Sequence, residues 1–321
     1  MRRTLGFVGI AIGVFLIVAA PLIKWYLAPR AARIPLDEHS VTTSVSDGRS
    51  SALDKGTLKI RTGLTLTNRL VVHGDGPAGS GHTAVWDSLT RLTDADGLMI
   101  QASKERTALD RVSGMAVNCC QEQLDGVDVR HEGLTFTFPL GTAKKSYPFW
   151  DAETKRAWPA EFGGTESAFG LTLYHFRQII PATDVETLEA PLSLLNQPGQ
   201  GSTTVHRYYE NAVDLLVEPT SGIIVRGDQH QIQTLRDGTG RSLVTVADVN
   251  AAFTQDTQKY WAGRAKDAIS QLGLVRAVLP LVSLILGVAL VVLGTLLIGL
   301  LGLRGPTAGS HSPARRPVTT P

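Results

Sequence analysis

Cysteine is scarce in this sequence: 2 of its 321 residues are cysteine, and they are neighbours, Cys119 and Cys120. A single adjacent pair excludes a disulfide-rich scaffold and a cysteine-based metal site, because both need several spaced cysteines. Three states of the pair stay open: two buried thiols, a disulfide between the neighbours, or bridges between chains. Intact mass with and without a reductant distinguishes them.

Catalytic signatures are also missing. The 8 histidines are scattered without an H-E-x-x-H pair, and no G-x-S-x-G elbow occurs, so zinc-protease and serine-hydrolase chemistry lack support. Residues 74–79 match the G-x-G-x-x-G fingerprint, but a strand-like stretch follows instead of the helix that dinucleotide binding requires. We therefore expect no enzyme, no catalytic residue, no cofactor and no metal.

Acidic residues are absent from both ends of the chain, because all 29 lie between Asp37 and Asp267. Each end instead contains a long uncharged stretch, residues 5–23 and 277–303. At about 1.5 Å rise per residue, each stretch can cross a hydrocarbon core about 30 Å thick. The sequence therefore predicts two transmembrane helices that bracket residues 24–276.

Basic residues flank the two stretches: Arg2 and Arg3 precede the first, and Arg304, Arg315 and Arg316 follow the second. Short basic flanks favour the cytoplasm. We expect a two-pass protein of the cell membrane, with residues 1–4 and a disordered tail, 304–321, inside and residues 24–276 extracytoplasmic. A cleaved signal peptide is the alternative for the first stretch, and N-terminal sequencing of the mature protein tests it.

The middle of the chain is mildly acidic, with 26 basic and 29 acidic residues between 24 and 276. This balance argues against a nucleic-acid partner. Apolar residues in this region recur mainly with period two, which predicts strands at 57–72, 134–138, 171–176, 213–218, 222–235 and 242–249. The expected fold is an α+β membrane protein, with a β-rich antiparallel domain of short strands between the two transmembrane helices.

Three segments, 85–90, 149–154 and 217–222, predict hairpin turns of a meander, because in each an Asp or Pro after an apolar residue can open a tight turn. Three- and four-residue spacing predicts a helix over 248–275 instead, with Asp248 as N-cap. This helix is expected to continue into the second span, with a break near Gly273 and a kink at Pro280.

Small residues recur four apart within the spans, at Gly9 and Gly13 and at Ser283 and Gly287. Such pairs let helix backbones approach closely in lipid, so we expect the spans to pack on each other or on further copies. The alternative is that glycine is simply common in membrane helices.

The densest charged segment, 104–114, contains Glu105, Arg106, Asp110 and Arg111. These four residues could form two ion pairs that stabilise a turn, or the two arginines could bind an anionic head group. Replacing both arginines by glutamine separates the two interpretations: the first predicts loss of folding, and the second predicts weaker binding of a ligand.

Aromatic residues gather at Tyr147, Trp150 and Trp158. Aromatic side chains on strands usually belong to the core. The alternative is that these three line an apolar tunnel for acyl chains, which makes them candidate ligand contacts.

Three segments resemble those of a known family. They contain Glu105, Arg106, Leu109, Asp110, Arg111 and Gly114, then Phe138, Pro139, Gly141, Thr142, Lys144, Tyr147, Trp150 and Asp151, and finally Glu218, Pro219 and Gly222. Together with the terminal spans, they are similar to the actinobacterial PorA-type porin family, which implies a cell-wall channel. The plan of one span at each end also resembles class B scavenger receptors, whose ectodomain has a lipid tunnel.

A single-chain barrel needs many lipid-facing strands of about ten residues. The predicted strands are shorter, so a pore would be an oligomer with two helices from each copy. Our main hypothesis is that the ectodomain binds or conducts a lipid or other hydrophobic molecule, with an oligomeric porin and a structural scaffold as alternatives. The expected partners are the bilayer, such a ligand and further copies of the chain.

Overall fold

The computed structural model describes residues 2–28 and 33–302. The chain divides into two compact units: a helix unit, Met1–Ala31 with Leu272–Pro321, and a β domain, Ala32–Gln271. The expected cytoplasmic tail, 304–321, lies outside the described residues. Residues 2–4, expected to precede the first span, already belong to a helix.

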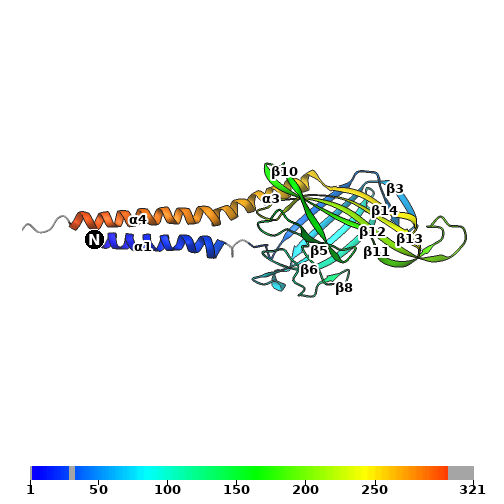
Figure 1. Cartoon of the computed structure of the whole chain (residues 1–321), viewed down its shortest axis with the longest axis horizontal. Helices are drawn as coiled ribbons and strands as arrows, with labels where there is room; N and C mark the ends of the chain where they lie inside the picture. Colours follow the sequence, from blue (N-terminus) through cyan, green and yellow to red (C-terminus); the bar gives the residue numbers. More distant parts are fainter. Residues whose placement is uncertain (1, 29–32, 303–321) are drawn as a thin grey trace, which may run out of the picture. The chain divides into compact units, whose positions relative to one another are not determined.

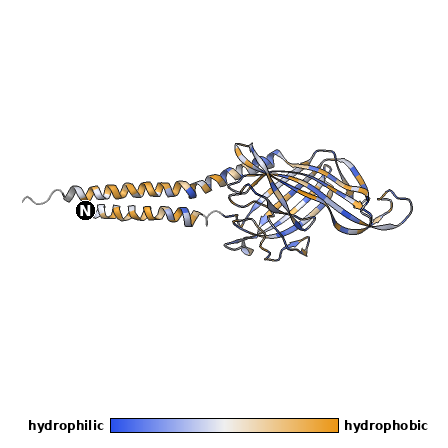
Figure 2. Ribbon diagram, in the orientation of Figure 1, coloured by the Kyte–Doolittle hydropathy of each residue, from blue (hydrophilic) through white to orange (hydrophobic). Residues whose placement is uncertain are grey.

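The helix unit contains two long helices, α1 (Arg2–Leu22) and α4 (Leu279–Gly302). A π-helical turn adjoins each of them, η1 (Ile23–Leu27) and η3 (Leu274–Val278). Figure 2 colours most of α1 and α4 as hydrophobic. Two helical stretches, Thr4–Leu27 and Gln255–Gly299, are long and apolar enough to cross a membrane.

Helices α1 and α4 pack on each other through glycines. A Cβ on Gly13 would lie 2.6 Å from the carbonyl oxygen of Gly287, and a Cβ on Gly287 would lie 2.7 Å from that of Gly13. Gly294 makes the same close approach to Gly6, at 2.7 Å, whereas Gly9 has only an ordinary contact, 3.7 Å. Any side chain at Gly13 or Gly287 would separate the backbones.

The β domain is built on one antiparallel sheet (Figure 1). Its strands are β1 (His39–Ser46), β2 (Ser50–Asp54), β3 (Lys59–Leu64), β4 (Leu66–Gly74), β5 (Thr83–Asp94), β6 (Met99–Asp110), β7 (Gln123–Leu124), β8 (Val127–Asp128), β9 (Tyr147–Asp151), β10 (Arg156–Ala168), β11 (Leu171–Pro191), β12 (Ser202–Val217), β13 (Ile224–Arg236) and β14 (Ser242–Phe253). The order is β8-β7-β6-β5-β4-β1-β14-β13-β12-β11-β10-β9, with β2 and β3 beside β14. A short 3₁₀ helix, η2 (Gly76–Ala78), lies between β4 and β5.

Isolated bridges connect the two ends of this strand order. Leu109 of β6 pairs with Ala116, Met115 pairs with Leu134, and Leu134 pairs with Phe149 of β9. The sheet therefore curls, and its concave face encloses the interior of the domain. An aromatic cluster around Phe138, which is fully buried, forms part of the core at the β9 end.

Two of the three predicted hairpin turns are present. One connects β9 to β10, where Asp151 accepts a hydrogen bond from the backbone N–H three residues on, at 2.8 Å. Glu218 does the same between β12 and β13, at 2.7 Å. The third prediction is wrong: residues 85–90 lie inside β5, where Asp87 pairs with Arg106 across the sheet instead of opening a turn.

The predicted strand at 134–138 is also wrong. Its alternation does bury Leu134 and Phe138, but Leu134 makes only isolated bridges. The N–H of Phe138 donates to the carbonyl of Gly222 at 2.9 Å, in the turn after β12. The hydrogen bonds of this segment thus go to a turn rather than to a strand ladder.

The helix before the second span begins later than predicted, as α3 (Gln255–Gly273). Asp248 instead lies in β14, paired with Ile232 of β13. Thr254 takes the capping role, because its hydroxyl accepts a hydrogen bond from Thr257 N at 3.2 Å. Pairing with β13 along the whole of β14 overrides the helical spacing of these residues.

The strands are much longer than the sequence predicts. β11 has 21 residues and β12 has 16. The predicted strand ends at residue 176, but β11 continues past it, and its register with β12 shifts between Ile180 and Thr183 and again between Asp184 and Glu186. A bulge absorbs an extra residue without ending the strand.

Candidate functional site

A cavity of about 670 Å³ lies inside the β domain. Small-molecule sites span roughly 300–1,000 Å³, so this volume can hold a ligand. The lining comes from β1, β4, β5, β9, β12, β13, β14 and α3, and from residues within 33–38, 135–140 and 221–223. We call it the domain cavity.

Strand β1 presents hydroxyl groups to the domain cavity. Ser40, Thr42 and Ser44 alternate along it and all line the cavity, with Ser40 and Ser44 buried. Ser44 lies opposite Asn68 of β4, which lines the cavity as well. Polar alternation in a strand normally predicts a solvent-facing side, so sequence reasoning missed these residues.

Aromatic and aliphatic side chains form another wall. Trp86 and Phe136 pack with their ring centroids 5.8 Å apart, beside Leu70 and Val72 of β4. Trp86 Nε1 donates to the carbonyl of Pro35 at 3.2 Å. The polar edge of the indole is therefore satisfied, and its ring remains an apolar surface.

One face of α3 lines the domain cavity, through residues such as Trp261 and Arg264. Trp261 Nε1 donates to Thr42 Oγ1 at 3.0 Å. Arg264 pairs with the buried carboxylate of Glu38, Nη1 to Oε1 at 2.5 Å and Nη2 to Oε2 at 3.0 Å. Burial lowers the pKa of Arg264, but the hydrogen bonds and charge of Glu38 outweigh it and raise that pKa.

Three residues of the cavity lining have a buried oxygen without a hydrogen-bond partner among the described residues: Asn68 Oδ1, Thr135 Oγ1 and Asp228 Oδ1. Arg33 Nε, also in the lining, is a buried donor without a partner among these residues. Leaving a buried acceptor unpaired costs about 1–3 kcal/mol. Native proteins pair nearly all such groups. A molecule with hydrogen-bond donors would be stabilised beside these oxygens.

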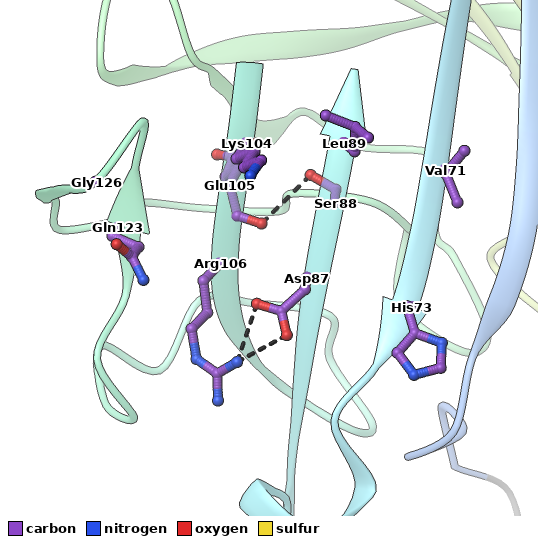
Figure 3. A pocket seen from close by; sticks show the side chains of 10 residues that line it. All are labelled: Val71, His73, Asp87, Ser88, Leu89, Lys104, Glu105, Arg106, Gln123 and Gly126. Carbon is purple, nitrogen blue, oxygen red and sulfur yellow. Dashed lines mark hydrogen bonds and ion pairs between the residues drawn. The ribbon is translucent and has the colours of Figure 1, made fainter. Parts of the chain in front are cut away.

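A smaller hollow of about 430 Å³ lies over β4, β5 and β6 (Figure 3). It is lined by Val71 and His73 of β4, which alternate with the cavity-lining Leu70 and Val72 and so lie on the outer face. Figure 3 shows Arg106 and Asp87 pointing toward each other in it.

All three nitrogens of the Arg106 guanidinium have partners. Nη1 donates to Asp87 at 2.7 Å, Nη2 donates to Asp75 at 2.8 Å, and Nε donates to the carbonyl of Cys120 at 3.1 Å. The hydrogen bond to Asp75, followed by that to Asp87, raises the pKa of Arg106. Arg111 has separate partners, since its Nε donates to the carbonyl of Ile34 at 2.7 Å. The two arginines are thus held apart by internal contacts.

The two ion pairs that one interpretation placed among Glu105, Arg106, Asp110 and Arg111 do not form, because the ionic partners of Arg106 and Glu105 lie outside residues 104–114. Glu105 accepts hydrogen bonds from His131 and Trp150, and Asp110 accepts one from the backbone N–H of Ser113 at 2.8 Å. Adjacent residues of a strand point to opposite faces, so neighbours in sequence such as Glu105 and Arg106 do not meet.

A buried polar cluster surrounds His131, whose side chain is fully inaccessible. Its Nε2 lies 2.8 Å from Glu105 Oε1, and its Nδ1 lies 2.8 Å from Glu122 Oε2. Burial lowers the pKa of His131, but the hydrogen bonds and charges of Glu105 and Glu122 outweigh it and raise that pKa to about 9. Burial also raises the pKa of Glu122, yet His131 brings it below its usual value.

The aromatic candidates lie outside the domain cavity lining. Tyr147 is buried against Phe138 and Phe176. Trp150 is buried and donates to Glu105 at 2.8 Å, and Trp158 donates to Thr154 at 3.0 Å. The aromatic lining comes instead from other rings, including Trp86, Phe136, Phe149, Phe253 and Trp261.

Cys119 and Cys120 are joined by a disulfide, with their Cα atoms 3.8 Å apart. Asn118, with φ of 57°, precedes the pair, and Gln121, with φ of 62°, follows it. The disulfide therefore sits in a tight turn of left-handed residues, next to Glu122 of the His131 cluster.

Comparison with known proteins gives consistent matches. A model of the family described as Porin PorA matches residues 5–296. A Porin PorA of Corynebacterium amycolatum is 27% identical over 381 residues, covering 92% of this chain and 98% of that protein. A Porin PorA of Corynebacterium resistens is 28% identical over 111 residues, covering 29% of this chain and 27% of that protein.

Proposed function

This chain belongs to the Porin PorA family, as its motifs indicated, and from that premise we propose that it forms channels in a cell-envelope membrane as an oligomer. The observation that supports this is the extent of the family match, which runs over residues 5–296 and so includes both apolar helices and the β domain. The family favours this alternative over our main hypothesis of a lipid-binding ectodomain.

The polar outer face of the sheet favours a pore built from helices. Along β14, the exposed residues include Thr245, Asp248 and Asn250. A membrane barrel turns an apolar band about 25 Å tall toward lipid. The exposed apolar residues of the helix unit, such as Phe15 and Leu281, fit lipid or a second copy better. Both termini would then be cytoplasmic and the β domain outside.

The test is conductance of the full chain in planar lipid bilayers. We expect discrete steps that are absent from protein-free bilayers, and crosslinking in the same lipid should trap oligomers. If the folded chain yields no crosslinked oligomer and no conductance steps, the proposal of an oligomeric channel is refuted.

The domain cavity supports a second function, in which the β domain receives a hydrophobic or amphiphilic molecule. Arg33 and Gln271, which line the cavity, are separated from the apolar helices by only a few residues of chain. The bilayer is therefore a ready source of such a molecule. Mass spectrometry of lipids extracted from the purified full chain tests this function: a stoichiometric lipid supports it, and a chain without lipid opposes it.

A further inference from the structure

We propose that the domain cavity binds an uncharged amphiphile with one alkyl chain and a head group that carries hydroxyl donors. This inference rests on the second function above and names its ligand class. Three features of the lining lead to it: cancelling charges, unpaired acceptors on a hydroxyl-rich wall, and an apolar wall facing the same space.

The charges of the lining leave little excess for an ionic head group. The lining includes two cations, Arg33 and Arg264, and three anions, Glu38, Asp228 and Asp267. Glu38 and Arg264 neutralise each other in a two-point ion pair. Asp228 pairs with Arg226, which lies outside the lining. Burying an ionic group without an opposite charge is costly, so a neutral head group fits this lining best.

The polar wall calls for a ligand with hydroxyl donors. Asn68 Oδ1 and Asp228 Oδ1 are buried acceptors without a partner among the described residues, and the unpaired Thr135 hydroxyl can accept or donate. Arg33 Nε is an unpaired donor, whose hydrogen bond the oxygen of a hydroxyl can accept. Ser44, opposite Asn68 in the β1–β4 register, adds a hydroxyl that can donate or accept. Hydroxyl groups of a ligand can satisfy all of these positions, whereas a carboxylate or a phosphate diester brings only acceptors.

The apolar wall suits an alkyl chain. Trp86, Phe136, Leu215 and Ile224 line the same cavity of about 670 Å³. An apolar cavity of about 150 Å³ already binds benzene, so this volume accommodates a chain together with a small head group. Burying each CH₂ of the chain contributes about 0.8 kcal/mol.

The experiment uses the full chain in phosphatidylcholine nanodiscs and 1-O-dodecylglycerol with a photoreactive diazirine in its alkyl chain. Peptide mass spectrometry locates the labelled residues. We expect saturable labelling of cavity peptides from β4 and β12, which excess unlabelled 1-O-dodecylglycerol blocks and excess dodecanoate does not. Labelling of α1, which contacts the bilayer in our proposal, serves as the non-saturable reference.

Two variants of matched size, Asn68→Leu and Thr135→Val, remove the unpaired oxygens of these two residues. Each lost hydrogen bond should raise the half-saturating probe concentration, by about tenfold for the double variant. Without probe, the unfolding midpoint should stay level or rise, because a buried unpaired acceptor is gone. If one variant fails to fold, the other gives an independent test. Thr245→Val, on the exposed face of β14, is the control and should change neither quantity.

If dodecanoate blocks the saturable cavity labelling equally well, or if both variants leave that labelling unchanged, the proposed ligand class is wrong. The second function, binding of a hydrophobic or amphiphilic molecule, would still stand. No cavity labelling by this probe or by a photoreactive dodecanoate would overturn both.

Discussion

His131 Nδ1 lies 2.8 Å from Glu122 Oε2, in a site where the imidazole is wholly buried. The other ring nitrogen faces Glu105 at the same distance. Because carboxylates accept hydrogen bonds, the ring donates from both nitrogens and is a cation. This buried triad links β6 to the segment between the vicinal disulfide and Leu134, the residue that bridges to β9.

Replacing His131 by leucine should destabilise the β domain by about 3–5 kcal/mol, because two carboxylates would remain without their cation. Chemical unfolding followed by tryptophan fluorescence measures the change. His230→Gln is the matched control, since its pair with Asp248 is half exposed and should contribute less than about 1 kcal/mol. Equal effects of the two substitutions would contradict the role of the triad.

The stability of the β domain should fall between about pH 6.5 and 9. The pKa of His131 is raised from 6.5 to about 9 in the folded chain, so folding favours its protonated form. That contribution is complete below the unfolded pKa and is lost as pH rises through the folded pKa, a loss of roughly 3 kcal/mol. The unfolding midpoint of the parent chain should therefore fall as the pH rises through this range, whereas that of His131→Leu should depend little on pH. If the parent chain is equally stable at pH 6.5 and pH 9, the proposed role of His131 is refuted.

Arg106→Gln should weaken folding rather than ligand binding. The substitution leaves Asp75 and Asp87 without their shared cation, and partial exposure of both carboxylates limits the cost to about 1–2 kcal/mol. Arg49→Gln, at an arginine 84% exposed, is the control and should have no measurable effect. If Arg106→Gln left unfolding unchanged but abolished binding of anionic lipid vesicles, the anion-site interpretation would be restored.

Gly13→Leu should separate α1 from α4. Its Cβ would lie 2.6 Å from the backbone of Gly287, so no rotamer relieves the clash. A cysteine pair placed across the two helices should lose its crosslinking in this variant, and conductance should fall with it. Gly299→Leu is the control, because a Cβ there meets nothing within 4 Å. Unaltered crosslinking in Gly13→Leu would show that this contact is dispensable.

Much of the fold was accessible from local patterns. The uncharged stretches, the period-two runs and the turn residues Asp151 and Pro219 predicted helices, strands and two hairpins that the structure contains. Strand length was missed because the period-two apolar pattern of β11 stops at residue 176, whereas ladder pairing with β12 continues to Pro191 through two bulges. The start of α3 was missed because ladder pairing with β13 extends β14 through Asp248.

The domain cavity could not have been found from the sequence. Ser40, Thr42 and Ser44 form an alternating polar stripe, which is typical of a solvent-facing strand. They face inward because the sheet curls and its ends join through Leu134, a contact between residues far apart in the chain. Tyr147 and Trp150 are buried in the core, which was the first interpretation of their clustering, and they do not line the cavity.

The sequence by itself determined what depends on composition and short-range spacing: two apolar helices at the ends, a β-rich domain between them, and family membership through local motifs. The tertiary structure alone decided which charges pair, which face of each strand is enclosed, and which oxygens are buried without a partner. These depend on strand register and sheet curvature, where a shift of one residue exchanges the inner and outer faces.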